Sequence, residues 1–341
     1  MLIKKETSSK NLIPYKAISQ QSIILDDDTN LISIELNGFD ISLLSNEERD
    51  NKIGLLSKVF RTIKEGATLV KVEMPIDLQK NQNHLKDLKS YLSQQFIDKN
   101  ISDKGYTSRV KQLDNQILTN HQISTSSTLS KSKFYLFIYA KNIKQLLSLY
   151  SNLEFLLKQI GLNPKLNSGT EIAQTLYTLY NPGEVANPNL YLDRSLKDFL
   201  SPTKIEFFKN HINLGSTIAQ IKNVYDYPLT TLDGWLAPLA LLKNTTFILN
   251  LKTLDIATAK KQIDTAMGHL KTHSISKASE DVNYNQHQDS FQNLLNSIIA
   301  GEEQLKITNL MIMTYANNQE DLNEINSELN SVIRQHGMFS R

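Results

Sequence analysis

Apolar residues along the chain alternate between the spacing of strands and that of helices, and the predicted order of elements occurs twice. In the first half, IILDDDTNLISIEL (23–36) alternates as a hairpin does, and ATLVKVEMPI (67–76) and KFYLFIYA (133–140) indicate two further strands. Polar helices are expected between these last two, at about 83–98 and 105–120. Two apolar stripes at helical spacing complete this half: Ile53, Leu56, Val59, Phe60 and Ile63, then Ile143, Leu146, Leu147, Tyr150, Leu153, Leu157 and Ile160.

The second half repeats this order. KIEFFKNHI (204–212) and STIAQIKNVYDYP (216–228) indicate a strand pair, and TTFILNLKTL (245–254) and QLKITNLMIMTYA (304–316) indicate two more strands. Helices are expected at WLAPLALLKN, over roughly 256–273, and along two stripes: Phe291, Leu294, Leu295, Ile298 and Ile299, then Leu322, Ile325, Leu329, Val332 and Ile333. Each half is therefore predicted as strand, strand, helix, strand, helix, helix, strand, helix.

This repeated order predicts an α+β fold of two similar ferredoxin-like (split β-α-β) lobes with helical inserts, a tandem pseudo-repeat. The predicted divisions are an amino-terminal arm at 1–20, a first lobe at 21–165, a connector at 166–203 and a second lobe at 204–337. The connector is rich in proline and asparagine and contains one short predicted helix, at about 170–180.

Composition limits the classes of function. The 37 basic and 35 acidic residues nearly balance, so charge does not favour wrapping nucleic acid. The absence of cysteine excludes disulfides, thiolate zinc sites and cysteine nucleophiles. The amino terminus lacks the apolar stretch of a secretory signal, and the most apolar window, WLAPLALL (235–242), is less than half of what a membrane crossing needs. No membrane span is predicted.

Nucleotide-binding fingerprints are absent from the sequence. It has no G-x-x-x-x-G-K-[ST] loop, and none of its 12 glycines forms a G-x-G pair. No cofactor is therefore expected to bind this chain.

Two histidines have the spacing of a metal pair. His269 and His273, in GHLKTH, would share one face of a helix. No HExxH pattern accompanies them, and further ligands would have to come from elsewhere in the chain. Structural or solvent-exposed roles are favoured over metal ligation.

Two acidic clusters are candidates for acid–base chemistry, DDD (26–28) and GEE (301–303). The first falls in a predicted hairpin turn, where aspartate is favoured by its hydrogen bonds to the backbone. The second follows an amphipathic helix, with Gly301 as a helix cap. Turn formation and capping explain both clusters, whereas catalysis would need two carboxylates brought together in a pocket.

The segment 80–111 mixes basic and aromatic residues, which raises the possibility of nucleic-acid binding. Its aromatic residues are Tyr91, Phe96 and Tyr106, and the aspartates that dilute its charge are Asp87, Asp98, Asp103 and, just beyond, Asp114. A solvated helical surface is the favoured interpretation. If this surface binds anything, mixed charge suits an anionic membrane face or a protein better than DNA.

The stretch YDYPLTTLDGWL (225–236) contains the only tryptophan and an Asp-Gly turn signal. Pro228 removes a ladder donor and ends the preceding strand, and Asp233 can cap the helix that follows the turn at Gly234. Trp235 can then lie over the sheet. A strand-to-helix corner explains the composition, and a ligand site is the alternative.

This corner resembles one in the conjugative type IV secretion ATPases, the TraE/TraC/TrsE-like proteins. The family's "v-x-x-Y-P … G-W-L" corner is matched by Val224, Tyr227, Pro228, Gly234, Trp235 and Leu236. A "G-E-E/Q-L" step into a strand is matched by Gly301, Glu302, Glu303 and Leu305. The first half is similar in layout, and the resemblance covers nearly the whole chain.

The resemblance implies the amino-terminal region of such a protein. Family members continue into a RecA-like motor domain, whereas this sequence ends at GMFSR, where that domain would begin. ATP and Mg²⁺ are therefore implied only for a motor domain outside this chain. The resemblance also implies docking on inner-membrane components of the secretion channel, homo-oligomerisation with the motor, and cytoplasmic placement at the inner face of the membrane.

The expected function is accordingly a non-catalytic assembly and docking region of a DNA-transfer ATPase. The alternative is a stand-alone scaffold or nucleic-acid-handling accessory protein of a conjugation system. Full-length relatives are ATPases, but this chain carries no catalytic motif, and DNA binding by this region alone is not expected. The structural or interface candidates are Tyr227, Pro228, Asp233, Gly234, Trp235, Gly301 and Glu302.

Overall fold

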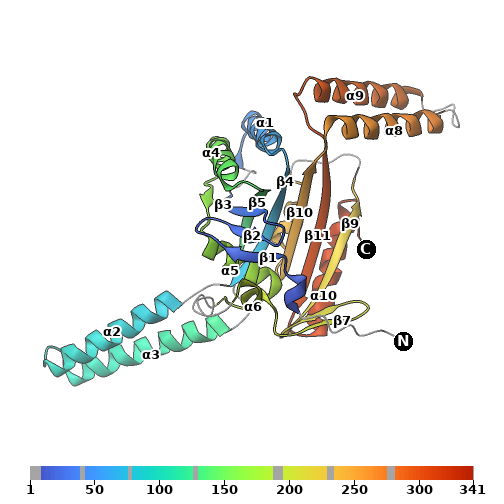
Figure 1. Ribbon diagram of the computed structural model, residues 1–341. Coiled ribbons are helices and arrows are strands. Elements are labelled where there is room, and N and C mark those ends of the chain that lie inside the picture. The colour runs from blue at the N-terminus through green and yellow to red at the C-terminus, as the bar shows by residue number, and fades with distance from the viewer. Residues whose placement is uncertain are drawn as a thin grey trace.

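The protein is built around one large antiparallel sheet, as a computed structural model shows (Figure 1). The structure describes residues 9–38, 43–75, 79–125, 130–186, 195–228, 234–274 and 281–340. Within them, the strand order is β1-β2-β3-β5-β4-β10-β11-β9-β8-β7, with β6 and β12 paired to β3 and β9. Helices and this sheet make up an α+β fold, as the sequence predicts.

The first half of the chain contributes the strands from β1 to β4 in the strand order, together with β6. Its strands are β1 (Tyr15–Ile18), β2 (Ile23–Leu25), β3 (Asn30–Leu36), β4 (Gly66–Pro75), β5 (Ser130–Ala140) and β6 (Lys165–Leu166). Its helices are η1 (Ser9–Leu12, a 3-10 turn), α1 (Asn46–Thr62), α2 (Gln79–Ile97), α3 (Asp103–Thr125), α4 (Ile143–Ile160), α5 (Gly169–Tyr180) and α6 (Leu196–Leu200).

The second half contributes the rest of the sheet. Its strands are β7 (Ile205–Phe207), β8 (Ile212–Leu214), β9 (Thr217–Asp226), β10 (Thr245–Thr253), β11 (Lys306–Ala316) and β12 (Phe339–Ser340). Its helices are α7 (Ala237–Leu241), α8 (Ile256–Ser274), α9 (Asp281–Ile299) and α10 (Gln319–Gln335).

The two halves share one pattern of strand pairing. In the first, β1 pairs β2, β3 pairs β2, β5 and β6, and β4 pairs β5. In the second, β7 pairs β8, β9 pairs β8, β11 and β12, and β10 pairs β11. The interpretation of the halves as tandem ferredoxin-like units stays a prediction, which this shared pattern supports.

The halves meet at the antiparallel pair β4–β10, where Leu69 lies opposite Leu249. The sheet is therefore continuous across the predicted boundary between the lobes. The predicted arm contains β1, which lies at one end of the strand order, and the predicted connector contains α5, whose Ile172 and Leu176 are fully buried. Both segments are thus integral parts of the core around the sheet.

One face of the sheet, here called the covered face, carries α1, α4, α7 and α10. Leu136 of β5 packs with Val59 of α1 and Leu146 of α4. In the second half, Ile312 of β11 packs with α7 and α10. The helices begin and end as their sequences dictate: α1 starts at a Ser45–Glu48 capping box, and α4 ends at Gly161, whose φ is 95°.

The other face, here called the open face, carries α5 and α6 over the first half only. Val70 and Phe137 pack there against Ile172 of α5 and Phe199 of α6. Among the described residues, the helices that pack on the sheet of the second half, α7 and α10, lie on the covered face. Strands β9, β10 and β11 therefore expose side chains on the open face.

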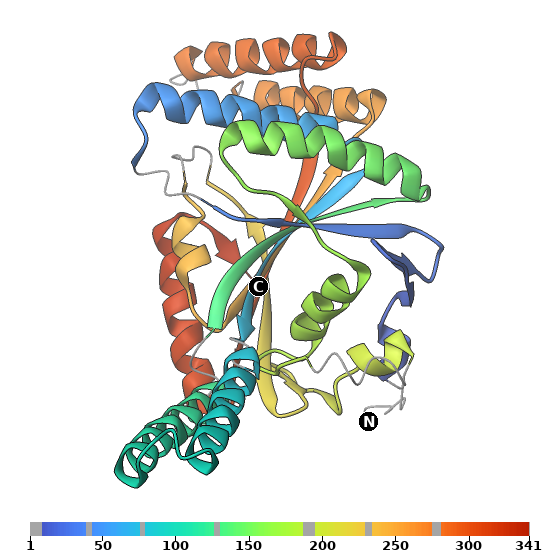
Figure 2. The same cartoon turned by 90° about the vertical axis from the view of Figure 1, so that its left-hand side faces the viewer.

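Two helical hairpins project from opposite ends of the sheet, α2–α3 at the bottom and α8–α9 at the top of Figures 1 and 2. Each is inserted between neighbouring strands whose ends lie opposite one another, Pro75 with Ser130 and Thr253 with Lys306. The hairpins pack on themselves: Phe96 stacks on Tyr106 with ring centroids 4.5 Å apart, and α8 and α9 share a separate apolar cluster. They are appendages of the sheet rather than parts of its core.

Candidate functional site

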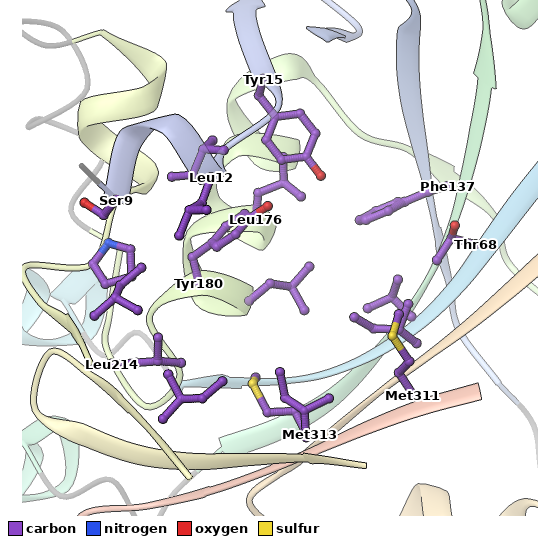
Figure 3. A pocket seen from close by; sticks show the side chains of 18 of the residues that line it. Ser9, Leu12, Tyr15, Thr68, Phe137, Leu176, Tyr180, Leu214, Met311 and Met313 are labelled. Atoms are coloured by element: carbon purple, nitrogen blue, oxygen red, sulfur yellow. The ribbon is translucent and has the colours of Figure 1, made fainter. Parts of the chain in front are cut away.

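The open face contains an apolar cavity of about 390 Å³, shown in Figure 3. Helix α5 forms one wall, with Leu176 and Tyr180, and η1 contributes Leu12. The sheet contributes residues from both halves, including Phe137 of β5 and Met311 and Met313 of β11. The cavity thus lies on the open face, at the boundary between the area under α5 and the area that no described helix covers.

A chain of polar groups crosses the sheet side of the cavity. The Tyr139 hydroxyl donates to Thr68 Oγ1 over 3.3 Å, and Thr68 Oγ1 donates to Asn250 Oδ1 over 2.9 Å. This chain joins β5 and β4 of the first half to β10 of the second. A ligand that enters the cavity would meet neutral hydrogen-bonding groups in an apolar lining.

Two more tyrosines lie at the α5 side of the cavity. The rings of Tyr15 and Tyr180 meet edge to face, with centroids 6.3 Å apart. Burial raises the pKa of Tyr15, Tyr139 and Tyr180, so all three hydroxyls stay neutral at physiological pH. No Lys, Arg, His, Asp or Glu is among the described residues that line the cavity, which therefore suits an uncharged and mostly apolar group.

The rim of the cavity is apolar and exposed. Leu12, Phe207 and Ile221 retain 51%, 70% and 50% of their accessible surface. Several exposed apolar side chains around one apolar hollow are typical of an interaction surface rather than of solvated protein surface.

The most deeply buried charges lie on the covered face, away from this cavity. Lys71 and Glu73 of β4 are 0% and 3% exposed. The Lys71 ammonium donates to the carbonyl oxygens of Leu242 (2.7 Å) and Thr245 (2.9 Å). Since Leu242 is the C-cap of α7 and Thr245 is the first residue of β10, the lysine ties the first half to the second. It is enclosed by protein and has a structural role.

Hydrogen bonds set the charge state of this pair. Burial by itself raises the pKa of Glu73, but Lys71 and the hydroxyls of Ser130 and Ser132 outweigh it and hold this pKa below its usual range. Burial lowers the pKa of Lys71, against the opposing effect of Glu73. The carboxylate is therefore ionised at physiological pH.

The predicted corner brings together part of the candidate set. Trp235 is half-buried and meets Tyr227 edge to face, with centroids 6.4 Å apart and planes at 89°. The Tyr227 hydroxyl accepts a hydrogen bond from the backbone N–H of Leu310 (3.2 Å). Gly234 has a φ of 71°, as a turn glycine requires, and Pro228 is half-buried at the end of β9. Asp233, the predicted helix cap, lies outside the described residues, and the N-cap position of α7 is Leu236, which makes no side-chain capping bond.

The corner is a structural element of the second half. Tyr227, Trp235 and Leu236 pack against the apolar cluster formed by β9, β11 and α10. Trp235 is only partly buried, so it covers the edge of this cluster rather than filling its centre. None of these residues lines the apolar cavity of the open face.

Gly301 and Glu302 lie elsewhere, just beyond α9. Gly301 has a φ of 75° and its N–H donates to the carbonyl of Ile298, so its predicted role as a helix cap is confirmed. The Glu302 carbonyl accepts a hydrogen bond from the Arg61 guanidinium of α1. The GEE step therefore connects the α8–α9 hairpin to the first half.

The DDD cluster is confirmed as a turn. Asp27 accepts hydrogen bonds from the backbone N–H (3.0 Å) and the hydroxyl (2.9 Å) of Thr29. Asp28 has a φ of 63°, and its carboxylate pairs with Lys16 across the hairpin. Asp26 pairs with Lys197 of α6 at 2.8 Å, and Asp27 also pairs with Lys141 at 3.2 Å, so the turn is tied to neighbouring elements as well.

His269 and His273 both fall in α8, and nothing further is described of their side chains. Among the described residues, no cluster of three or more histidines and carboxylates could hold a metal ion. Over the same part of the chain, every helix is too short or too polar to cross a bilayer.

Local patterns in the sequence do not predict the cavity. Its lining comes from short strands, α5 and alternate positions of long strands that lie far apart in the chain, so local spacing does not reveal it. Met311 and Met313, two residues apart on a predicted strand, were one available signal, since alternate residues share a face.

Neither a protein-family model nor a curated protein sequence matches the chain.

Proposed function

We propose that this chain is a non-catalytic docking and assembly region that binds other proteins through its open face. The observation that carries the proposal is the apolar cavity with its exposed rim of Leu12, Phe207 and Ile221. Burying such a surface against a protein releases water from apolar area, which is the main driving force of association.

The chemistry of the cavity favours binding over catalysis. General acid–base catalysis uses groups with a pKa near the working pH. The titratable groups that line the cavity are tyrosines, and burial moves the pKa of each further above neutrality. The buried Lys71–Glu73 pair is enclosed on the other face of the sheet and has no access to a substrate.

The projecting hairpins also suit an assembly role. Helix α2 exposes Leu88, Tyr91 and Ile97, while the charged residues Lys89 and Asp114 of α2 and α3 pair with one another at 2.6 Å. A helical arm with mixed charge and exposed apolar residues fits a protein contact better than nucleic-acid phosphates.

The specific assignment that we propose is the amino-terminal region of a conjugative type IV secretion ATPase. It is based on the resemblance of the corner around Tyr227 and Trp235 and of the step at Gly301. Under this proposal the docking partners are inner-membrane components of the secretion channel, and the region oligomerises together with its motor and lies peripherally at the cytoplasmic side of the membrane. The runner-up is an accessory scaffold or nucleic-acid-handling protein of a conjugation system.

Site-specific photo-crosslinking tests this function. A photoreactive amino acid replaces Phe207 on the rim, and a matched control carries it at Phe155, which is exposed on α4 at the covered face. In host cells, crosslinks at position 207 to inner-membrane channel proteins, with none at position 155, are the expected result. Crosslinks at position 207 to DNA would favour the runner-up, and equal labelling from both positions would contradict a docking role for the open face.

A further inference from the structure

We propose that the open face of the second half is a seat for an amphipathic helix of a partner protein, which packs on β9, β11 and β10 as α5 packs on β3, β5 and β4. This inference specifies the partner chemistry of the docking function proposed above and rests on it. The occupant presents an uncharged stripe of aliphatic residues to the cavity.

The first line of evidence is the strand pairing shared by the two halves. The elements from β1 to β6 have counterparts in those from β7 to β12, with the same neighbours in the sheet. In the first half, α5 begins three residues after β6 and covers the open face. The described residues contain no counterpart of α5 on the second half. The cavity lies on the strands that such a counterpart would cover.

The second line is the difference in burial between equivalent surfaces. Under α5, Leu31 of β3, Val70 of β4 and Phe137 of β5 are 0%, 1% and 3% exposed. On the corresponding strand of the second half, Ile221 of β9 is 50% exposed. An apolar side chain that is half exposed on a long central strand gains stability when a helix covers it.

Helix α5 shows how such a helix is held. It starts at a capping box in which Ser168 accepts from the N–H of Glu171 and the Glu171 carboxylate accepts from the N–H of Ser168. Ile172, Ala173 and Leu176 form its buried stripe. With the buried Gly169 they lie at i, i+3, i+4 and i+7, which is the anchor spacing of a helix that lies in an apolar groove.

The cavity matches the side chains of such a stripe rather than a whole helix. A hollow of about 390 Å³ has the volume of a cube about 7 Å on a side, whereas a helix with its side chains is roughly 10 Å across. Side chains of one face could enter the hollow while the helix itself lies on the rim. Tyr180 of α5, at the near wall, would then contact the incoming helix, and the lack of charged lining residues favours aliphatic anchors.

Binding of an isolated α5 helix tests the proposal. The probe is a fluorescein-labelled peptide of residues 165–181, which carries the capping box and the stripe, added to the full chain. On the first half, the chain's own α5 already covers the open face and excludes the peptide, because α5 acts at a high effective concentration. We expect saturable binding, measured by fluorescence anisotropy, with a Kd of about 10–100 μM.

Matched variants locate the binding. Ile221→Asp should weaken peptide binding at least about tenfold, since a carboxylate would be desolvated under the helix, and a peptide with Leu176→Asp should fail similarly. Phe155→Asp, an exposed site on the covered face, should leave binding unchanged. Circular dichroism checks that each variant is folded, and Phe207→Asp on the exposed rim replaces Ile221→Asp if the latter is not.

Several outcomes would overturn the helix proposal. The first is no saturable binding at millimolar peptide, and the second is binding that Ile221→Asp leaves intact. The third is a lipid that co-purifies with the wild-type chain but not with Ile221→Asp, as native mass spectrometry would show. The fourth is a dimer of the chain that Ile221→Asp dissociates. The crosslinking experiment tests the docking function separately. Crosslinks from position 207 without peptide binding would support the docking function but contradict the helix proposal. The absence of both crosslinks and peptide binding would contradict both proposals.

Discussion

Lys71 Nζ lies 2.5 Å from Glu73 Oε1, and the two side chains are among the most enclosed in the protein. Both belong to β4, two residues apart on the covered face, yet the lysine also bonds to the carbonyls of Leu242 and Thr245 in the second half. The glutamate accepts from the hydroxyls of Ser130 and Ser132 of β5. One ion pair thus satisfies polar groups from three separate segments at the joint between the halves.

Lys71→Met should destabilise the protein by roughly 3–5 kcal/mol, because it leaves the Glu73 carboxylate buried without its counter-ion. Urea unfolding at neutral pH measures the change. The double variant Lys71→Met/Glu73→Gln removes the unpaired charge and should recover much of the loss. Lys16→Met, which breaks the exposed pair with Asp28, is the control and should behave as wild type. Equal losses in the single and the double variant would contradict an electrostatic role for the pair.

Acid should weaken the fold through Glu73. Its folded pKa lies below the ordinary value of 4.5, so the folded state binds fewer protons than the unfolded state. The stability gained is full above pH 4.5 and is lost as the pH falls through the folded pKa. Glu73→Gln should therefore reduce the slope of unfolding free energy against pH below 4.5. An unchanged slope would show that other carboxylates cause the acid sensitivity.

Gly169→Ala and Gly54→Ala should have opposite effects. A Cβ at position 169 would lie 2.0 Å from the carbonyl oxygen of Ser19, so α5 would be displaced from β1, at a cost of about 3 kcal/mol. A Cβ at position 54, in the exposed middle of α1, meets nothing within 4 Å and should stabilise the helix by roughly 0.5–1 kcal/mol. Thermal melts of both variants measure these changes. An unchanged melting temperature for Gly169→Ala would show that α5 does not pack tightly against the segment after β1.

Trp235→Ala should destabilise the second half by about 1–3 kcal/mol, less than the cost of removing a fully buried aromatic side chain, because Trp235 is half-buried. The matched control is Leu241→Ala in the adjacent helix α7, where the side chain is largely exposed and little change is expected. Chemical denaturation measures both. If Trp235→Ala leaves stability unchanged but abolishes partner capture, the tryptophan is an interface anchor instead.

Removal of the α2–α3 hairpin should leave the sheet folded. Pro75 and Ser130 lie opposite one another at the ends of β4 and β5, so an Asn-Gly turn can replace residues 76–129. The shortened protein should keep a single cooperative unfolding transition, as monitored by circular dichroism. Two transitions, or an unfolded product, would show that the hairpin supports the core.

Local patterns in the sequence predicted most of the elements and their order. The apolar stripe from Ile143 to Ile160 is α4, and the alternation around Val70 and Val72 is β4. These predictions succeed because each depends on the contacts of one element with the face that it covers. Strand pairing across the chain depends instead on residues 180 positions apart, such as Leu69 and Leu249, and no local signal encodes it.

The cavity could be predicted less well than the elements, because its lining also depends on residues that are far apart in the chain. The corner at Trp235 was found because rare residues are concentrated there, whereas the cavity uses common residues such as Leu12 and Ile221. In ATLVKVEMPI (67–76), Lys71 and Glu73 alternate with valines, a pattern typical of the solvated side of a half-buried strand. Helices α7 and α10 cover that side in the folded protein, so alternation of polar and apolar residues misled at this position.

The β4–β10 joint has a consequence for the order of events during synthesis. Strands β1 to β6 all precede residue 167, whereas β10 begins at Thr245, and domains generally fold as they emerge. A nascent first half would therefore present β4, ten residues long, as an unpaired edge open to aggregation. Lys71 sits on that edge, and an inward-pointing charge is one means by which proteins discourage wrong partners there. The carbonyl groups that Lys71 binds are synthesised later, with α7 and β10. The lysine that stabilises the complete sheet would therefore first disfavour wrong pairing at the exposed edge of β4.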